Sequence, residues 1–155
     1  MSHLAKLQIT NFRNLLDVGL SLHNGMTVFH GDNGEGKTSL LEAIYYLSVG
    51  RSFKAENERE VVNQTVALTG GQCVIYGQAI KLEKEYQIVL LAQSYPKQRT
   101  DSSENSYLIK KQIRVNKVAK TASDLFGTIS AVVFHVDDIR TVSYTHLTLP
   151  TNREV

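Results

Sequence analysis

The sequence predicts an α/β fold in which a glycine-containing loop connects an amino-terminal β-rich part to one helix, with a β-rich insertion after that helix. Two observations predict it. Residues 27–50, TVFHGDNGEGKTSLLEAIYYLSVG, read as a short apolar strand, a loop, and a helix with apolar residues at helical spacing. The residues that follow contain β-branched and aromatic runs without the regular strand–helix alternation of a doubly wound sheet.

Three strands are expected before the loop, at residues 4–9, 15–22 and 26–29. The second alternates apolar and polar residues, and the third is a short apolar run of the buried type. A turn at residues 23–25, His-Asn-Gly, separates these two strands.

Residues 31–38, GDNGEGKT, match a phosphate-binding loop in its expected context between a strand and a helix. Gly31 and Gly36 let backbone amides turn inward around a triphosphate, and the amino terminus of the next helix favours the same anion. Lys37 is expected to reach the outer phosphates and Thr38 to hold Mg²⁺. The alternative, a glycine-rich turn before an ordinary helix, is disfavoured by this context.

The helix is expected over residues 37–48, with Gly50 as its carboxyl-terminal stop. After it, residues 51–60 and 93–106 are polar or aperiodic and predict loops, whereas alternating or apolar runs predict strands. A single helical turn at residues 122–126, capped by Thr121 or Ser123, precedes Gly127. The expected strands of this part are residues 72–81, 86–91, 107–115 and a buried strand at 129–134.

The composition is that of one soluble domain, with 155 residues, 42% hydrophobic and 21% charged. No apolar run approaches the ~20 residues that span a bilayer, and the amino terminus lacks the apolar core of a secretory signal, so we expect a cytoplasmic protein without a membrane partner. The single cysteine, Cys73, is expected to be buried in a strand. The net charge of +2 leaves the partner open, and the five histidines show no metal-ligand spacing.

Three segments together resemble the bacterial RecF recombination protein family. They are ITNFRN at residues 9–14, GDNGEGKTSLLEAIYYLSVGRSF at residues 31–53 and SDLFG at residues 123–127, and the resemblance covers about residues 3–142. It implies the amino-terminal part of an ATPase head of the SMC-like branch of the ABC ATPases. It also implies that the full-length protein binds ATP and Mg²⁺, dimerises around ATP, and is a weak DNA-dependent ATPase. Single-stranded or gapped DNA, RecO and RecR are the implied partners, in replication, repair and the SOS response to DNA damage.

The resemblance assigns roles to particular residues. Arg13 is implied to lie near the nucleotide; the alternative for this residue is a solvated cation at a strand end. Arg51 and Lys54 are candidates for contacts to DNA phosphates, which carry no sequence information. The sequence departs from the family pattern at residues 135–138 and 116–117, away from the loop. The implied nucleotide-binding residues are Arg13, Gly31, Asp32, Asn33, Gly34, Glu35, Gly36, Lys37, Thr38 and Ser39.

Residues 131–138, AVVFHVDD, offer an alternative, because an apolar strand that ends in two acids also describes a magnesium-coordinating Walker B segment. With Asp137 or Asp138 in that role, the chain would be a self-contained small P-loop NTPase or kinase. His135 interrupts the apolar run, and the flanking residues resemble a different part of the family pattern, so we expect the true Walker B and signature segments beyond this chain. A domain with a vestigial loop is disfavoured by the intact Lys37–Thr38 pair.

The carboxyl-terminal residues suggest a boundary near residue 142. VSYTHLTLPT, at residues 142–151, resembles a translated sequencing-adapter sequence, and a divergent native tail is the alternative. We therefore expect residues 1–142 to be a truncated, incomplete ATPase head and residues 143–155 to be a non-native tail. Such a fragment would bind nucleotide without useful hydrolysis, because phosphoryl transfer needs several parts at once. It would also expose strand edges and aggregate.

Overall fold

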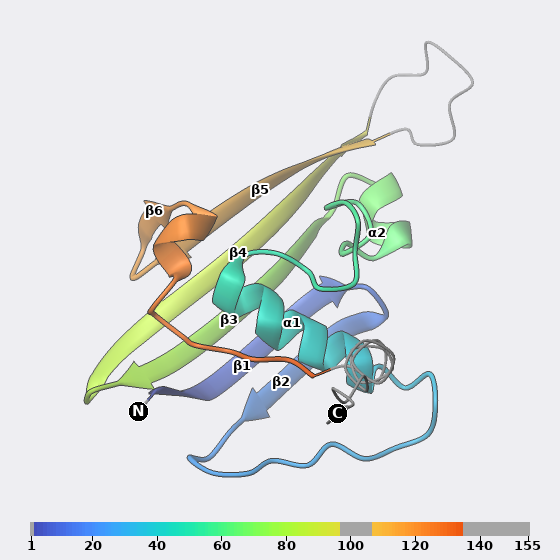
Figure 1. The fold of residues 1–155 in the computed structure, drawn as a ribbon. Helices are drawn as coiled ribbons and strands as arrows, with labels where there is room; N and C mark the ends of the chain where they lie inside the picture. The colour runs from blue at the N-terminus through green and yellow to red at the C-terminus, as the bar shows by residue number, and fades with distance from the viewer. Residues whose placement is uncertain (1, 97–106, 135–155) are drawn as a thin grey trace, which may run out of the picture.

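The computed structural model describes residues 2–96 and 107–134, and it contains one six-stranded antiparallel sheet with helix α1 lying across one face (Figure 1). The strand order is β2-β1-β3-β4-β5-β6. The amino-terminal hairpin and the later β-rich segment therefore share one sheet, because β3 pairs directly with β1. The elements are β1 Ser2–Phe12, β2 Leu15–Ser21, α1 Lys37–Val49, α2 Gln64–Leu68, β3 Gln72–Lys81, β4 Lys84–Pro96, β5 Tyr107–Val115, β6 Val118–Lys120 and a 3₁₀ helix at Ala122–Leu125.

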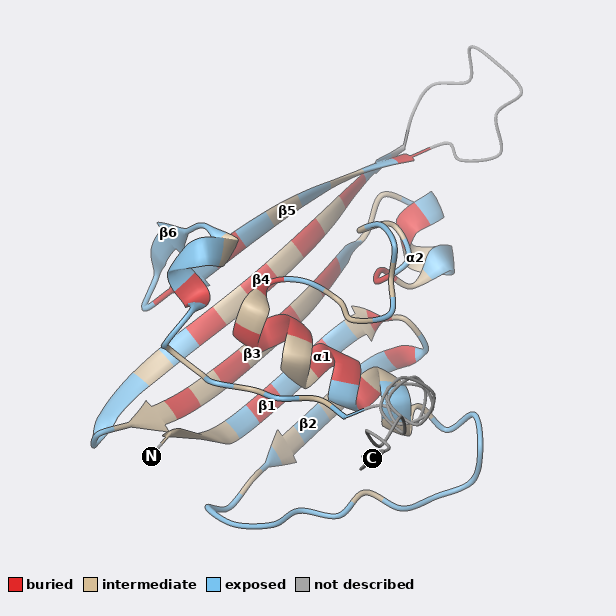
Figure 2. Ribbon diagram, viewed as in Figure 1, coloured by how far each residue is buried: buried red, intermediate tan, exposed pale blue. Residues whose placement is uncertain are grey.

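The core lies between α1 and the face of the sheet that α1 covers, where most of the buried positions of Figure 2 gather. Strand β3 illustrates this, because every second residue, namely Cys73, Ile75, Gly77 and Ala79, is buried toward the core. From the helix, Ala43 and Leu47 are fully buried. The sheet and α1 thus form two layers around one apolar core.

Five predicted strands and the long helix are confirmed. The strands predicted at residues 4–9, 15–22, 72–81, 86–91 and 107–115 correspond to β1 to β5. Helix α1 ends where Gly50 adopts φ 70° and donates its N–H to Tyr46 O at 2.8 Å. The predicted turn is the 3₁₀ helix Ala122–Leu125, with Thr121 as its N-cap, whose N–H donates to Asp124 Oδ2 at 2.8 Å.

The strands predicted at residues 26–29 and 129–134 are wrong. Neither segment belongs to the sheet of the described residues, and Met26, Val28, Val132 and Phe134 are 93%, 72%, 81% and 84% exposed. An apolar run becomes a strand only where a neighbouring strand satisfies its backbone groups, and none lies beside these runs in the described part of the chain.

Two short elements were not predicted. Helix α2 has five residues, too few for a helical periodicity to show, and begins after Asn63, whose Oδ1 accepts from Val66 N at 3.4 Å. Strand β6 has three residues and pairs with the end of β5. The loop predicted at residues 93–106 begins later, because β4 extends to Pro96; residues 97–106 lie outside the described residues.

In the described residues, no helix has the length and apolar character needed to cross a membrane.

Candidate nucleotide-binding site

The predicted phosphate loop leads directly into the first turn of α1. Gly36 is the N-cap, with φ 95°, a conformation that glycine adopts without strain. A Cβ at this position would lie 2.7 Å from Leu15 Cδ2 and 3.1 Å from Asn14 Nδ2, so side chains of the β1–β2 turn press against the loop. The positive φ, more than this crowding, makes glycine the favoured residue here.

The first turn of α1 suits an anion. It contains no acidic residue, and no side chain caps its amides. Leading N–H groups of a helix lack partners within the helix and carry the positive end of its dipole. A phosphate placed before Lys37 would therefore meet backbone N–H donors and the positive end of the helix dipole. In this respect residues 31–38 suit the triphosphate that the sequence predicts.

Lys37 and Glu35 fold back onto the loop. Lys37 Nζ donates to Gly31 O and Asp32 O, both at 2.7 Å, and Glu35 Oε2 accepts from Asp32 N at 2.9 Å. These contacts close the loop on itself. To reach a phosphate, Lys37 must exchange two carbonyl oxygens for phosphate oxygens. Asn33, Gly34 and Thr38 are exposed beside it.

Asn14, rather than Arg13, contacts the loop. Asn14 Nδ2 donates to Gly34 O at 3.3 Å, and Asn14 Oδ1 accepts from Ser39 Oγ at 2.7 Å. This role of Asn14 was not predicted from the sequence. The signal in the sequence was that Asn14 ends the segment ITNFRN, which carries part of the family resemblance. Its contacts with Gly34 and Ser39 depend on how the β1–β2 turn lies against α1.

Arg13 belongs to a different contact. Its Nη2 donates to Glu42 Oε1 at 2.7 Å, and its Nε lies 2.5 Å from Glu42 Oε2. The Glu42 side chain is fully buried in α1, whereas the Arg13 side chain is 20% exposed. The structure thus places Arg13 neither as a solvated cation nor among the loop contacts, but as the partner of a buried carboxylate.

The two candidate DNA contacts, Arg51 and Lys54, are exposed just beyond the other end of α1. Helix α1, which begins at Lys37 of the loop and ends just before this segment, has 13 residues and a rise of about 18 Å. The predicted nucleotide and DNA residues are therefore not neighbours; they lie at opposite ends of one helix.

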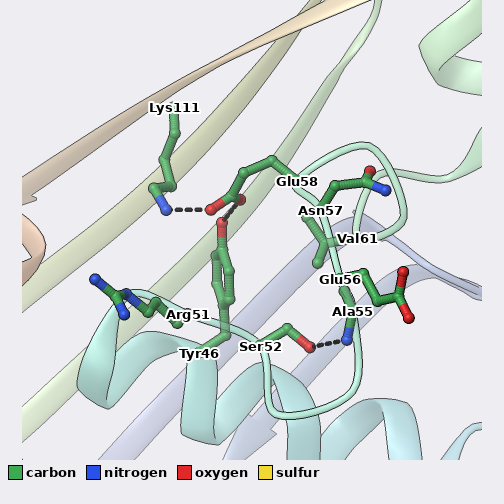
Figure 3. A pocket seen from close by; sticks show the side chains of 9 residues that line it. All are labelled: Tyr46, Arg51, Ser52, Ala55, Glu56, Asn57, Glu58, Val61 and Lys111. Carbon is green, nitrogen blue, oxygen red and sulfur yellow. Dashed lines mark hydrogen bonds and ion pairs between the residues drawn. The ribbon is translucent and has the colours of Figure 1, made fainter.

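A pocket of about 220 Å³ lies beside the segment that follows α1, between that segment and β5 (Figure 3). Glu58 organises it by accepting from Tyr46 Oη and Lys111 Nζ, and Lys111 Nζ also donates to Gly50 O at 2.9 Å. Its volume is below the ~300 Å³ at which small-molecule sites begin. Two of its charged residues, Glu58 and Lys111, are paired with each other, and this pair ties the segment to β5.

The Walker B alternative lacks its strand, since residues 131–134 form none, and Asp137 and Asp138 lie outside the described residues. The segment 143–155, predicted to be a non-native tail, also lies outside them. In the described residues, no group of three or more His, Cys, Asp or Glu side chains is arranged to hold a metal ion.

Comparisons with known proteins bear on the family and the fold of this chain. The family model described as "AAA domain" matches residues 6–145. The "DNA replication and repair protein RecF" of Clostridium novyi is 32% identical over 141 residues, which is 90% of this chain and 34% of the relative. That of Herpetosiphon aurantiacus is 32% identical over 143 residues, 91% of this chain and 37% of the relative.

Among solved structures, that of "the recombination mediator protein RecF-ATP in RecFOR pathway" matches with a TM-score of 0.70 and 26% identity. It covers 91% of this chain and 35% of the matched chain. The corresponding RecF-ATPrS structure matches with a TM-score of 0.70 and 27% identity, over 91% of this chain and 34% of the other. The chain thus spans about a third of the length of the relatives it matches.

Proposed function

Because this chain belongs to the AAA domain family, we propose that it is the ATP-binding amino-terminal part of a RecF-like protein that binds DNA in recombinational repair and replication. Its fold is that of the amino-terminal part of a P-loop ATPase of the ABC/SMC-like type. One observation carries the proposal. The uncapped first turn of α1 follows a loop closed by its own lysine, in a chain similar over nine tenths of its length to RecF-ATP.

In the proposed complex, backbone amides of residues 33–39 cradle the phosphates and Lys37 neutralises the outer ones. Thr38 is the Mg²⁺ ligand, because its exposed hydroxyl stands on the first helical turn. Asn14 fixes the loop from the β1–β2 turn through Gly34 and Ser39. Asp32 and Glu35 shape the loop through their own contact.

The activities of the whole protein extend the proposal. RecF-like function would include an ATP-dependent homodimer, recognition of single-stranded or gapped DNA, work with RecO and RecR, and a part in the cytoplasmic SOS response. Residues that complete the hydrolytic site are expected in the two thirds of the RecF relatives that this chain does not span. The chain alone therefore binds ATP and does not turn it over usefully.

The test of ATP binding is a titration of the 155-residue chain with a fluorescent ATP analogue and Mg²⁺. Lys37→Ala should weaken binding at least about tenfold, or about 1.4 kcal/mol, because it removes the cation nearest the outer phosphates. Lys84→Ala is the matched control, since Lys84 is an exposed lysine at the far turn of the sheet. Equal affinities for Lys37→Ala and Lys84→Ala would refute the nucleotide site.

The test of DNA contact uses a full-length RecF-like protein that carries residues 1–142. Replacing Arg51 and Lys54 by Ala removes two phosphate contacts, so the slope of log affinity against log salt should shrink by about 1.8 on duplex DNA. The pair Lys6→Ala and Lys84→Ala, which removes two other exposed cations, should leave that slope unchanged. An unchanged slope in the Arg51 and Lys54 variant rules out their role.

A further inference from the structure

The carboxylate of Glu42 is fully buried in the middle of α1, and phosphate binding by the loop does not explain it. A buried carboxylate is costly unless it is paired and hydrogen-bonded. Glu42 is hydrogen-bonded through Oε1, which accepts from Arg13 Nη2 and from Ser52 Oγ, and its Oε2 forms an ion pair with Arg13 Nε without a hydrogen bond. One carboxylate thus joins the β1–β2 turn, α1 and the segment that follows α1.

The Arg13 side of this cluster leads to the phosphate loop. Arg13 precedes Asn14, which contacts Gly34 and Ser39. The backbone at Arg13 has little freedom, since its N–H donates to Val61 O at 2.8 Å and its carbonyl accepts from Asn63 Nδ2 at 2.8 Å. A shift of Asn14 when the loop closes around a phosphate would therefore act directly on Arg13 and on its contact with Glu42.

The Ser52 side leads to the exposed cations. Ser52 Oγ accepts from Lys54 N at 2.8 Å and from Ala55 N at 2.7 Å while it donates to Glu42 (Figure 3 shows the Ala55 contact). The segment 51–55 is therefore folded around one hydroxyl oxygen. The direction in which Arg51 and Lys54 project depends on that oxygen keeping its place on Glu42.

We propose that Glu42 is a positioning residue that couples nucleotide binding at the phosphate loop to the conformation of the segment 51–55, which presents Arg51 and Lys54 to a nucleic-acid phosphate backbone. The proposal rests on the proposed function, because it needs ATP at the loop. The links run from Ser39 to Asn14, along the chain to Arg13, and then through side-chain contacts to Glu42 and Ser52. Since coupling is reciprocal, a phosphate backbone held by Arg51 and Lys54 tightens ATP to the same degree.

The test is amide hydrogen exchange, read by NMR, in the 155-residue chain with and without saturating Mg-ATP. In the unmodified chain, ATP should slow exchange at Lys54 and Ala55 at least about threefold, because an ordered loop holds Arg13, Glu42 and Ser52 in one arrangement. Ser52→Ala, which cuts the last link and leaves the Arg13–Glu42 pair intact, should abolish this slowing while ATP affinity stays within about twofold. Glu42→Gln should abolish it as well.

Two variants separate coupling from structure. Ser52→Thr keeps a hydroxyl and should restore the ATP response. Glu58→Gln weakens the contacts of the same segment with Tyr46 and Lys111, but Glu58 is not among the residues that connect the loop to Ser52. In this variant, ATP should therefore still slow exchange at Lys54 and Ala55. If ATP binds but leaves Lys54 and Ala55 unchanged in the unmodified chain, or slows them equally in Ser52→Ala, the coupling is refuted and the nucleotide site stands. If ATP does not bind at all, both proposals fail.

Discussion

At the scale of single residues, the site depends on neighbours in sequence that face different ways. Arg13 and Asn14 occupy the same tight turn, yet Arg13 reaches a buried carboxylate and Asn14 reaches the phosphate loop. Arg13 adopts φ 50°, a left-handed conformation that turns the chain sharply between β1 and β2. Arg13, which the sequence suggested as a nucleotide neighbour, therefore holds the fold of the site, and the side-chain amide of Asn14 contacts the loop.

Cys73 and Tyr46 make the protein sensitive to alkali. Burial, with the Glu58 charge second, raises the pKa of the Cys73 thiol to about 12, and burial with the Glu58 hydrogen bond raises the pKa of Tyr46 far above its usual range. Both groups are neutral when folded, whereas the unfolded chain releases their protons near pH 9 to 10. The contribution of these two neutral groups to the stability of the folded state is therefore complete below about pH 9, and it is lost as the pH rises toward 12.

Urea unfolding between pH 8 and pH 11 should show a free energy of unfolding that falls with pH, by up to ~1.4 kcal/mol per pH unit for each group. Cys73→Ala removes one group, so its stability, although lower throughout, should fall less steeply. Identical slopes for Cys73→Ala and the unmodified chain would contradict a raised thiol pKa.

At the scale of elements, α1 can approach the sheet closely because β3 has a glycine beneath it. A Cβ on Gly77 would lie 2.1 Å from Leu47 Cδ2 and 3.1 Å from Leu4 Cδ1. Leu47 is fully buried and has no room to move aside. The position of the helix, and with it the height of the phosphate loop above the sheet edge, depends on this contact.

Gly77→Ala should therefore destabilise the fold by about 1–3 kcal/mol, measured as the free energy of unfolding in urea. Gly19→Ala is the matched control, because Gly19 lies in β2 of the same sheet and a Cβ added there would meet no atom within 4 Å. Its effect should stay within about 0.5 kcal/mol. The close helix–sheet contact would be disproved by two substitutions of equal effect.

At the scale of the whole molecule, large apolar side chains are exposed on two segments whose sequences predict strands. Val28 and Met26 precede the phosphate loop, and Val132 and Phe134 follow the 3₁₀ helix. Apolar runs with unpaired backbone groups are sites where another chain pairs. This feature supports the expectation that the 155-residue chain associates with itself.

Replacing Val132 and Phe134 by Ser should shift the chain toward monomer in sedimentation velocity, with little change in melting temperature because both residues bury little surface. Leu82→Ser is the control, since Leu82 is a single apolar residue, 74% exposed, at the turn between β3 and β4. Monodisperse behaviour of the unmodified chain, or an equal gain from Leu82→Ser, would contradict this account.

The sequence by itself determined the features that local backbone chemistry controls. Gly36 and Gly50 bound α1 because each adopts a left-handed conformation, and the period-two burial of β3 matches its sequence. The loop at residues 31–38 and its direct connection to α1 were predictable for the same reason, whereas phosphate binding by this loop remains a prediction.

Tertiary structure alone decided which distant groups meet. It left residues 26–29 and 129–134 outside the sheet, because a strand needs a neighbour that one segment cannot supply. It also brought Arg13 into contact with Glu42, 29 positions away, and Ser39 into contact with Asn14, 25 positions away. Such pairings depend on where the sheet holds α1, a matter of packing between elements that no local pattern encodes.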